Sequence, residues 1–299
     1  MPKGTIVKAL SGFYYVKTSD SMIQCRARGR FRKDGMSPLV GDHVTIINDE
    51  NNEGRIEEIL PRKNSFIRPA VANIDTMVFV AANVNPITDP FLIDRVSVIC
   101  EHSDCELIIC VNKSDLDPGE EFFDIYNNTG FKIIGISAEN GQGIDELKDE
   151  LIGKKSVFTG NSGVGKSSIL NKMQPNLSLK IDDVSERLGR GKHTTRHVEF
   201  HEIAENTFMA DTPGFASFEV DMVADINKDE LQYCFPEFRD YIGHCRFDDC
   251  THRNEPNCAV LDALHNGSIS SSRHESYVRI YDVLNSRKEW EQKNQRNNV

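Results

Sequence analysis

Residues 160–167 have the composition and spacing of a phosphate-binding loop. They read Gly-Asn-Ser-Gly-Val-Gly-Lys-Ser and match the pattern G-x-x-x-x-G-K-[ST] in full. Residues 156–159, Ser-Val-Phe-Thr, read as a short buried strand and residues 168–173 have helical periodicity, so the loop is expected between a strand and a helix. Unpaired backbone N–H groups and the helix dipole make such a turn attractive to anions. The predicted nucleotide-binding residues are Gly160, Asn161, Ser162, Gly163, Val164, Gly165, Lys166, Ser167 and Ser168.

Two side chains of this loop could act directly on a nucleotide. Lys166 would reach the β- and γ-phosphates, and the Ser167 hydroxyl would ligate Mg²⁺. The alternative is a glycine-rich turn that matches by accident, which a chain of this length would do roughly once in a hundred times. Because the flanking strand and helix also fit, we predict nucleotide binding.

Residues 112–115 carry a second motif, Asn-Lys-Ser-Asp, which fits N-K-x-D. The Asp115 carboxylate can accept hydrogen bonds from the N1–H and the exocyclic amine of guanine, which adenine does not offer, and leaving such a group unpaired is costly. Asn112 and Lys113 would shape and cover the base pocket. Ser137 and Ala138 resemble the S-A element whose backbone N–H contacts guanine O6. Each short motif is commonplace alone, but together with the phosphate loop they predict that GTP and GDP are bound by Asn112, Lys113, Ser114, Asp115, Ser137 and Ala138.

Two segments after the phosphate loop could respond to the γ-phosphate. Residues 176–192 are polar and lack a sustained period, which is typical of a switch loop, and a threonine pair follows them. Thr195 is favoured over Thr194 as the contact to Mg²⁺ and the γ-phosphate, and the alternative is a plain basic loop. Residues 211–214 match D-x-x-G, where Asp211 would hold Mg²⁺ through water and the Gly214 N–H would contact the γ-phosphate. The residues predicted to carry catalysis are Lys166, Ser167, Thr195, Asp211 and Gly214.

The order of these motifs along the chain is unusual. Ordinary GTPases place the phosphate loop first and the two base motifs last, whereas here residues 112–115 and 137–138 precede residues 160–167. We therefore predict a circularly permuted domain, in which the packing is kept and the chain ends move. Residues 211–214 then lead directly into the C-terminal part, so the switch state and the position of that part should be linked.

Three cysteines and one histidine gather in residues 245–258 with the spacing Cys-x4-Cys-x-His-x5-Cys. Three thiolates and an imidazole suit one closed, tetrahedral, structural Zn²⁺ site. The alternative is that these are reduced cysteines in a polar loop. The segment has few apolar residues, however, so without a metal it would have little to keep it folded. His244 is left out because it would strain a tight loop. The predicted zinc ligands are Cys245, Cys250, His252 and Cys258.

The first part of the chain reads as short strands that could form a small barrel. Strands are expected over residues 4–9, 13–18, 22–27, 42–48 and 54–59, a pattern that favours an oligonucleotide-binding (OB) fold. Residues 26–33 alternate basic with small or aromatic side chains, which suits contact with a phosphate backbone, although most charge runs are solvated faces. The predicted RNA-binding residues are Arg26, Arg28, Arg30, Arg32 and Lys33.

A doubly wound α/β domain and a helical domain are expected to follow the barrel. Strand patterns at residues 76–82, 107–111, 131–136 and 156–159 alternate with helical patterns at residues 91–101 and 144–152. This alternation is typical of a parallel sheet that binds ligands at the carboxyl ends of its strands. Residues 61–69 resemble a linker, and residues 259–265 and 275–295 read as helices. The predicted domains are residues 1–68, an OB fold that binds RNA; 69–221, a permuted GTPase domain; and 222–299, a zinc-binding helical domain.

Composition is consistent with an ordinary multidomain protein. Hydrophobic residues make up 38% of the 299 positions and charged residues 27%. No signal-peptide pattern or membrane-length apolar run is present, so we expect a cytoplasmic protein without a membrane partner. Residues 1–68 carry 12 Lys and Arg against 8 Asp and Glu, a net +4 in a chain of net −11, which leaves −15 for the rest. Positive charge is thus concentrated at the end predicted to bind RNA.

These features together resemble the RsgA family of small-ribosomal-subunit-dependent GTPases, also called YjeQ and YloQ. The resemblance covers the whole chain: the barrel, the permuted motif order and the Cys/His cluster at residues 245–258. It implies a late-acting assembly factor, expected here as a monomer, that binds the small (30S) ribosomal subunit through its 16S rRNA. Such a factor hydrolyses GTP to GDP and phosphate in response to the subunit and then dissociates.

One part of the usual hydrolytic machinery is missing. Ras-like enzymes have a glutamine after D-x-x-G that orients the attacking water, whereas Phe215 holds that place here, and a phenyl ring cannot align a water. We expect slow isolated turnover, with His193 or His197 taking the role on the subunit, although loop solvation explains either histidine alone. The competing functions are a nucleotide-dependent binding module and, less compatible with residues 112–115, a P-loop ATPase or kinase.

Overall fold

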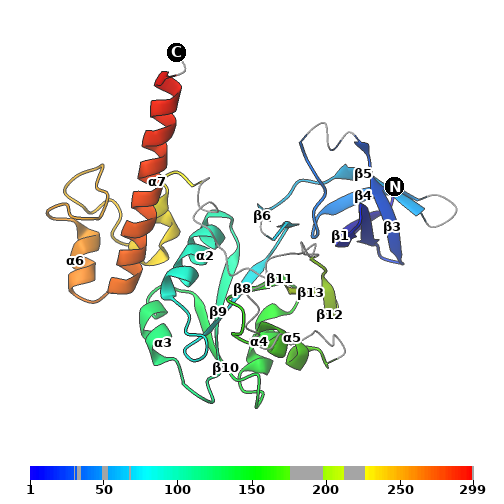
Figure 1. Ribbon diagram of the computed structural model, residues 1–299, viewed down its shortest axis with the longest axis horizontal. Coiled ribbons are helices and arrows are strands. Elements are labelled where there is room, and N and C mark those ends of the chain that lie inside the picture. The colour runs from blue at the N-terminus through cyan, green and yellow to red at the C-terminus, as the bar shows by residue number, and fades with distance from the viewer. Residues whose placement is uncertain are drawn as a thin grey trace, which may run out of the picture.

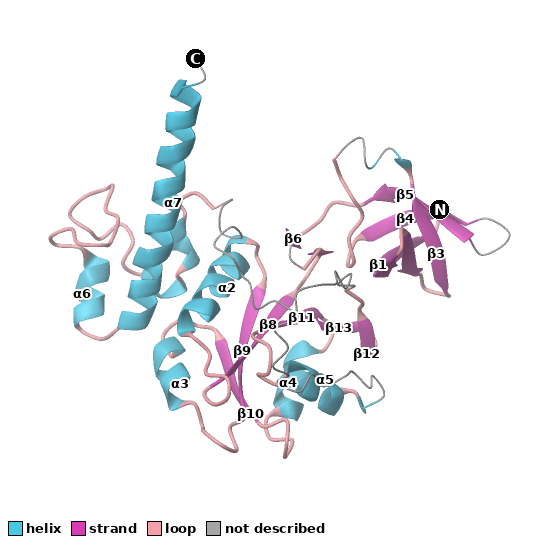
Figure 2. Cartoon of the chain, in the orientation of Figure 1, coloured by secondary structure: helices cyan, strands magenta, loops and turns pink. Residues whose placement is uncertain are grey.

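The computed structural model describes residues 1–29, 31, 35–48, 53–66, 69–175, 198–211 and 226–297. These residues form an N-terminal barrel, a central sheet covered by helices, and a C-terminal helical part that ends in a long helix (Figure 1). The barrel and the C-terminal part contact different sides of the central sheet (Figure 2). The predicted architecture, a barrel followed by an α/β domain and a helical part with a zinc-type cluster, is confirmed.

The barrel contains five strands, and each covers or nearly covers a strand expected from the sequence. They are β1 (Lys3–Leu10), β2 (Phe13–Lys17), β3 (Met22–Ala27), β4 (His43–Asn48) and β5 (Glu53–Ile59). The sheet closes in the order β1-β2-β3-β5-β4, with β3 and β5 parallel and the other pairs antiparallel. Alternate apolar residues of each strand, including Ile6, Val16 and Ile56, are fully buried inside it.

The segment between the barrel and the sheet is more ordered than a plain linker. It contains the short antiparallel pair β6 (Ser65–Phe66) and β7 (Val71–Ala72). The Ala72 N–H donates to the Val40 carbonyl at 2.9 Å, and the Arg62 guanidinium donates to both carboxylate oxygens of Asp42 at 2.7 and 2.8 Å. The segment is therefore attached to the residues that precede β4 of the barrel.

The central sheet has six strands in the order β10-β9-β8-β11-β13-β12. Its strands are β8 (Thr76–Ala82), β9 (Glu106–Asn112), β10 (Lys132–Ile136), β11 (Lys155–Thr159), β12 (His201–Ala204) and β13 (Thr207–Asp211). All neighbouring strands are parallel except β12, which pairs antiparallel with β13 at one edge. The helices are α2 (Pro90–His102), α3 (Glu120–Tyr126), α4 (Ile144–Leu151) and α5 (Lys166–Met173). Helix α3 is not among the predicted helices.

Two-residue alternation explains how the sheet is covered on both faces. In β8, Met77, Phe79 and Ala81 join the core formed with α2 and α3, whereas Val78 and Val80 face the core formed with α4 and α5. Every residue of β8 is buried, which is why its sequence is continuously apolar. The carboxyl ends of β8, β9, β10, β11 and β13 meet at one edge of the sheet, and the predicted nucleotide motifs follow those ends.

The C-terminal part is built from short helices, a cysteine-containing loop and a long helix. Its elements are η3 (Leu231–Cys234), η4 (Pro236–Phe238), α6 (Ala259–His265) and α7 (Ser271–Asn297). An aromatic cluster of Phe235, Phe238 and Tyr277 forms its core, with ring centroids 5.0 to 5.3 Å apart. Helix α7 packs beside α2 (Figure 1). No helix in the described ranges is long and apolar enough to cross a membrane.

Candidate nucleotide site and metal centre

The predicted phosphate loop joins the end of β11 to the start of α5. Gly160, Gly163 and Gly165 have φ values of 134°, 80° and 96°, which side chains other than glycine rarely adopt. A Cβ atom at Gly160 would collide with the Val80 carbonyl, and one at Gly165 would collide with the Asn112 side chain. Glycine is therefore required at both positions because neighbouring strand ends approach the loop closely.

Lys166 lies at the first position of α5 and folds back over the loop. Its Nζ atom donates to the carbonyl oxygens of Gly160 at 2.8 Å and Asn161 at 2.7 Å, and the side chain is buried. These bonds hold the ammonium group beside the space that the loop encloses. Ser167 and Ser168 follow in the first turn of α5, where the helix leaves N–H groups without helical partners.

Asn112 joins three of the predicted motifs. Its Nδ2 donates to the Val164 carbonyl of the phosphate loop at 2.7 Å, and its Oδ1 accepts from the Ala138 N–H at 3.1 Å. Because Asn112 is itself buried at the end of β9, a single amide fixes residues 112–115, 137–138 and 160–167 relative to one another. The structure thus brings the three loops together at one edge of the sheet.

The residues after Asn112 are held in an exposed turn. Lys113 has a φ of 67°, and its Nζ donates to the carbonyl oxygens of Val84, at 3.2 Å, and Asn85. Burial lowers the pKa of the Lys113 ammonium group. The Ser114 N–H donates to the Ile136 carbonyl at 3.0 Å, which ties the turn to β10. Asp115 is exposed, so its carboxylate is free to meet a base.

Ser137 and Ala138 begin a tight turn at the end of β10. The Ser137 Oγ accepts from the Asn140 N–H at 3.3 Å and the Ser137 carbonyl accepts from the Gly141 N–H at 2.8 Å. Ser137 is fully buried, while Ala138 is partly exposed next to Asn112. This turn therefore lies at the same edge of the sheet as Asn112.

The predicted switch residues fall mostly outside the described ranges. Asp211 ends β13, and its backbone is in parallel register with Phe158 of β11, two residues before Gly160. Asp211 therefore starts the D-x-x-G motif beside the phosphate loop. The described residues do not include Thr194 or Thr195, the histidines at 193 and 197, Gly214 or Phe215.

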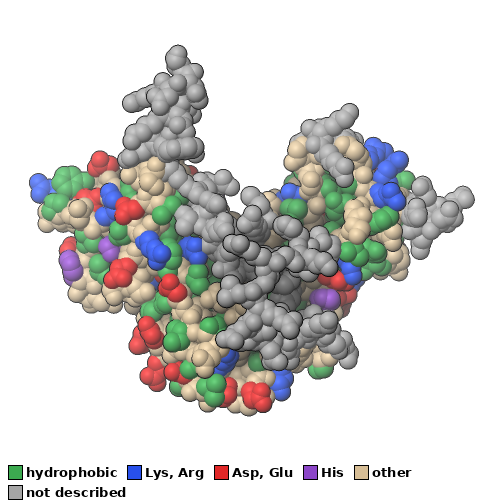
Figure 3. All heavy atoms as spheres, viewed as in Figure 1, with side chains coloured by type: hydrophobic (Ala, Val, Ile, Leu, Met, Phe, Trp, Pro, Cys, Tyr) green, Lys and Arg blue, Asp and Glu red, His purple; other side chains and the backbone are tan. Residues whose placement is uncertain are grey.

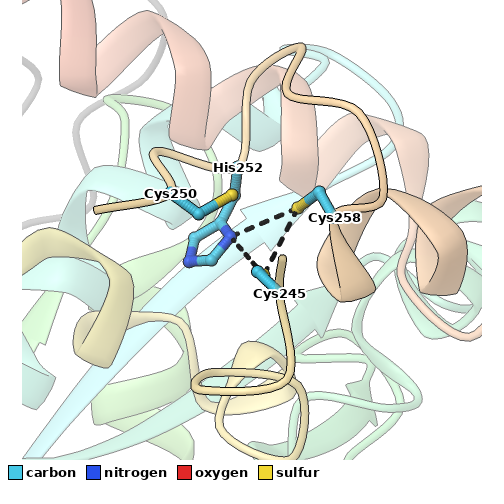
Figure 4. Close-up of side chains that lie close together, drawn as sticks. All are labelled: Cys245, Cys250, His252 and Cys258. Atoms are coloured by element: carbon cyan, nitrogen blue, oxygen red, sulfur yellow. Dashed lines mark hydrogen bonds between the residues drawn. The ribbon is translucent and has the colours of Figure 1, made fainter. Parts of the chain in front are cut away.

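The four predicted zinc ligands converge on one point (Figure 4). One donor atom from each of Cys245, Cys250, His252 and Cys258 lies within 4.8 Å of all the others. The Cys245 Sγ is 3.8 Å from the Cys258 Sγ, and the His252 Nδ1 is 3.6 and 3.3 Å from these sulfurs. Tetrahedral ligands at a Zn–S distance of about 2.3 Å lie about 3.8 Å apart. The donor set and its spacing fit one zinc ion, and His244 lies outside the cluster.

Neighbouring groups orient the His252 ring for metal binding. Its Nε2 lies 2.8 Å from Gln232 Oε1, a bond that places the proton on Nε2 and leaves Nδ1 as the ligand. The His252 carbonyl is 2.7 Å from His274 Nε2, and the Tyr277 hydroxyl donates to the Thr251 carbonyl at 3.0 Å. The loop is therefore held by α7 as well as by its own donor atoms.

Two of the five predicted RNA-binding residues are described, and both have local partners. The Arg26 guanidinium lies over the Phe13 ring at 4.5 Å, and Arg28 forms an ion pair with Glu57. The other three, Arg30, Arg32 and Lys33, lie outside the described residues. Of the two, Arg26 keeps a charge that no carboxylate neutralises among the contacts described.

Comparison with known proteins places the chain in a family. The family model described as RsgA GTPase matches residues 59–221, and the model described as RsgA N-terminal domain matches residues 3–56. The chain belongs to the RsgA GTPase family. The family is one of GTP-hydrolysing enzymes, so the chain is a GTPase whose loops at the sheet edge form its candidate nucleotide site.

Curated relatives match over almost their full length. The chain is 44% identical over 297 residues to the small ribosomal subunit biogenesis GTPase RsgA of Caldanaerobacter subterraneus subsp. tengcongensis, covering 98% of this chain and 99% of that one. It is also 44% identical to the RsgA protein of Bacillus cereus over 294 residues, covering 96% of this chain and 99% of the relative.

Two solved structures have the same fold. YjeQ from Thermotoga maritima is 36% identical, with a TM-score of 0.80 and coverage of 95% of this chain and 98% of that one. YloQ, described as a circularly permuted GTPase, is 38% identical, with a TM-score of 0.77 and 96% of each chain covered. The motif order in this RsgA-family chain is the permutation predicted from its sequence.

Proposed function

We propose that this RsgA-family GTPase acts in the biogenesis of the small ribosomal subunit. The observation that carries the proposal is the joining of three guanine-nucleotide motifs by Asn112 in a chain that matches, end to end, relatives described as small ribosomal subunit biogenesis GTPases. The protein binds the subunit, which stimulates its hydrolysis of GTP to GDP and phosphate. The protein then dissociates from the subunit.

Each nucleotide group has a proposed contact in this site. The exposed Asp115 accepts from the guanine N1–H and amine, and the Ala138 N–H faces guanine O6. Lys166 exchanges its two carbonyl partners for phosphate oxygens, and the N–H groups of residues 163–168 surround the phosphates. Asn112 and Lys113 act by positioning, because their hydrogen bonds are to the backbones of neighbouring loops.

Ser167 and Asp211 are proposed to hold Mg²⁺ with the bound GTP. Ser167 lies in the first turn of the helix after the phosphate loop, and β13 brings Asp211 next to β11, so both residues start from the same edge of the sheet. The ion would neutralise charge on the phosphates. Thr195, favoured over Thr194, and the Gly214 N–H are proposed to contact the γ-phosphate.

Stimulation by the subunit is the proposed answer to the missing glutamine. Phe215 follows D-x-x-G and cannot orient a water, so turnover by the isolated protein is slow. Contact with the subunit supplies or positions another group, with His193 and His197 as the candidates in this chain.

The barrel is proposed to bind the 16S rRNA of the small (30S) subunit. Residues 1–68 have a net charge of +4, and Arg26 is presented on a strand beside Phe13. The proposed organisation is an RNA-binding domain over residues 1–68, a permuted GTPase domain over 69–221 and a zinc domain over 222–299, in a cytoplasmic monomer.

The direct test is GTP hydrolysis by the purified protein with and without purified small subunits, with large subunits as the control. The proposal expects strong stimulation by small subunits alone. Equal rates with and without small subunits would disprove the stimulated reaction. The barrel would then be expected to bind some other RNA.

Lys166→Ala separates an enzyme from a nucleotide-dependent binding module. If hydrolysis drives release, the variant should lose multiple-turnover hydrolysis by at least about 100-fold and remain on the subunit, because it removes charge stabilisation at the transferred phosphate. Normal release without hydrolysis would favour the binding module. Competition between GTP and ATP in the same assay tests the ATPase alternative, which requires ATP to outcompete GTP for the site.

A further inference from the structure

Two arginines from different parts of the chain lie on the same aromatic ring. The guanidinium carbon of Arg279, on α7, is 3.8 Å from the ring centroid of Phe91, and that of Arg95, on α2, is 5.2 Å from it. Phe91 and Arg95 are four residues apart in α2 and share a helix face, which is the face that α7 crosses. A phenyl ring attracts cations and restricts the guanidinium groups that stack on it.

In the part of the chain that the structure describes, these two arginines lack the carboxylate partners that neighbouring arginines have. Arg239, Arg253 and Arg273 form ion pairs with Glu101, Asp282 and Asp94, respectively. Within the described ranges, Arg95 and Arg279 form no ion pair, and the buried Nε–H of Arg95 has no hydrogen-bond acceptor.

Nearby acidic groups do not remove the imbalance. The Asp89 carboxylate lies close enough to affect Arg95, but its Oδ1 accepts from the Phe91 N–H at 2.9 Å as the cap of α2. Glu275, one turn before Arg279 on α7, is exposed and makes no ion pair with it in the described structure. Burial, and then the charge of Arg279, lower the pKa of Arg95. The fold therefore holds two guanidinium groups close together, and the Arg95 Nε–H is a hydrogen-bond donor without an acceptor among the described residues.

The pair lies near the nucleotide edge of the molecule. Seven residues separate the end of β8 from the start of α2, and the carboxyl end of β8 is at the edge that carries the phosphate and base loops. Lys and Arg side chains lie among Asp and Glu side chains on the face formed by α2 and α7 (Figure 3). A partner that contacts both arginines would span the GTPase part and the zinc part of the chain.

We propose that Arg95 and Arg279 form a clamp for a phosphate of the RNA backbone in the small subunit. A guanidinium fork matches phosphate oxygens, and two forks beside one ring can hold a single phosphate from two sides. The chain has a net charge of −11, so it is repelled by most acidic partners. A nucleic acid backbone has a much higher density of negative charge than a protein surface with single carboxylates, so it attracts the two neighbouring guanidinium groups more strongly. An RNA phosphate is therefore favoured over a protein carboxylate as the ligand. This clamp rests on the proposed function, since its RNA is that of the subunit.

The test measures binding of the full chain, loaded with a non-hydrolysable GTP analogue, to small subunits over a range of salt concentrations. Arg279→Gln and Arg95→Gln/Arg279→Gln are compared with Arg239→Gln, which removes an arginine already paired with Glu101. The double variant should bind about 10-fold more weakly near physiological salt, and the slope of log affinity against log salt should fall by about 1 to 2, while Arg239→Gln changes the slope little. Arg279→Gln, at an exposed position, should give about half the change in slope and guards against misfolding of the double variant.

The outcomes separate the clamp from the function it rests on. If wild-type protein binds and the double variant binds equally with the same slope, the clamp is wrong and the proposed function stands. If wild-type protein does not bind small subunits at all, both are wrong. A photo-crosslinking side chain placed at the exposed position 275 should join to rRNA; crosslinks to ribosomal protein alone would overturn the choice of RNA as the partner.

Discussion

Arg273 and Lys17 each form an ion pair that joins two parts of the molecule, but the Arg273 pair is buried and the Lys17 pair is partly exposed. Arg273 extends from α7 into the interface with α2 and has no exposed surface. Lys17 extends from the barrel to Glu202 on β12, and about a third of each side chain remains exposed. The two junctions of the central sheet domain therefore rest on different physical chemistry.

The zinc-side junction is a buried network. The Arg273 guanidinium donates to Glu237 at 2.7 and 3.2 Å, to Asp94 at 2.8 Å and to Ser97 at 2.9 Å. The Tyr126 hydroxyl of α3 also donates to Asp94, at 2.8 Å. Because a buried charge without its partner is very costly, this network permits essentially one arrangement of α7 against α2 and α3.

The barrel contacts β12 and the residues before it through exposed groups. Lys8 pairs with Glu199 at 2.7 Å, Lys17 pairs with Glu202, and the Phe200 N–H donates to the Val7 carbonyl at 2.8 Å. A cavity of about 690 Å³ lies between β1, β2 and β4 on one side and β11 and the β12–β13 turn on the other. Such pairs are each worth less than about 1 kcal/mol, so this contact can rearrange at little cost.

This difference suggests a division of labour between the two ends. The C-terminal part, residues 226–297, is joined to α2 and α3 through buried charged groups, whereas the barrel contacts residues 198–204. These residues follow the predicted switch loop, residues 176–192, and the threonine pair at 194–195. Binding at the barrel can therefore reach the switch through residues 198–204, and four changes test the contrast.

The largest expected effect comes from removing a zinc ligand. Cys258→Ala should abolish zinc binding and unfold residues 245–258, because in small zinc modules the binding free energy of about 10 kcal/mol or more is folding free energy. Hydrogen exchange should show loss of protection there and in η3, with the barrel unchanged. Cys234→Ala, which removes a buried thiol outside the cluster, should retain zinc. Loss of barrel protection in Cys258→Ala would contradict the independence of the two junctions.

Arg273→Met should destabilise the protein by about 3–5 kcal/mol, since it leaves Asp94 and Glu237 buried without a cation. The free energy of unfolding from denaturant titration measures this loss. Arg273→Met/Asp94→Leu/Glu237→Met should recover much of it. A loss below about 1 kcal/mol in the single variant would show that water reaches the network.

The same variant has an expected pH dependence. Burial raises the pKa of Asp94, and Arg273 is the main charge that opposes the rise. Without Arg273 the folded-state pKa rises further above the unfolded value, so the penalty is present at high pH and is relieved as pH falls through the folded pKa. The destabilisation of Arg273→Met should therefore be smaller at pH 5 than at pH 8, and an increase toward pH 5 would contradict this assignment.

Gly41→Ala tests the attachment of the barrel to the β6–β7 segment and should cost about 1–3 kcal/mol. Gly41 has a φ of 97°, and a Cβ there would collide with the Ala72 carbonyl. Gly12→Ala, also at positive φ but with open space around it, controls for backbone strain alone. Equal unfolding free energies for the two variants would mean that the approach of Gly41 to Ala72 contributes nothing.

The smallest effect on stability is expected at the exposed pairs. Lys8→Met/Lys17→Met should change the free energy of unfolding by less than about 1 kcal/mol and basal GTP hydrolysis very little. Stimulation by small subunits should fall several-fold if the barrel acts through residues 198–204. Full stimulation in this variant, measured beside the wild type, would assign the coupling to another path.

Much of the fold was predictable because its signals are local. The five barrel strands and the strands from β8 to β11 were expected to within about two residues, since two-residue alternation and continuous apolar runs reflect burial directly. Helix α3 was missed because it has only seven residues and two buried ones, Phe122 and Tyr126. Strand β6 lies within residues 61–69, which the sequence indicated to be a linker, because two-residue strands leave no periodic pattern.

Sequence by itself identified the groups that come together at both candidate sites. The spacing in residues 160–167 and 245–258 specifies a phosphate loop and a zinc-type donor set because in each case the groups act together within one turn or loop. The motif order also revealed the permutation, since order is a property of the chain alone.

Only the tertiary structure decided how these local units are held relative to one another. The Asn112 bonds to Val164 and Ala138 join residues up to 52 positions apart, and the Arg273–Asp94 pair joins residues 179 positions apart. No periodicity in the chain encodes such pairs, because each depends on where packing of the sheet and helices places a buried polar group and what it finds there. The Arg95–Phe91–Arg279 arrangement arises in the same way, from α7 crossing α2.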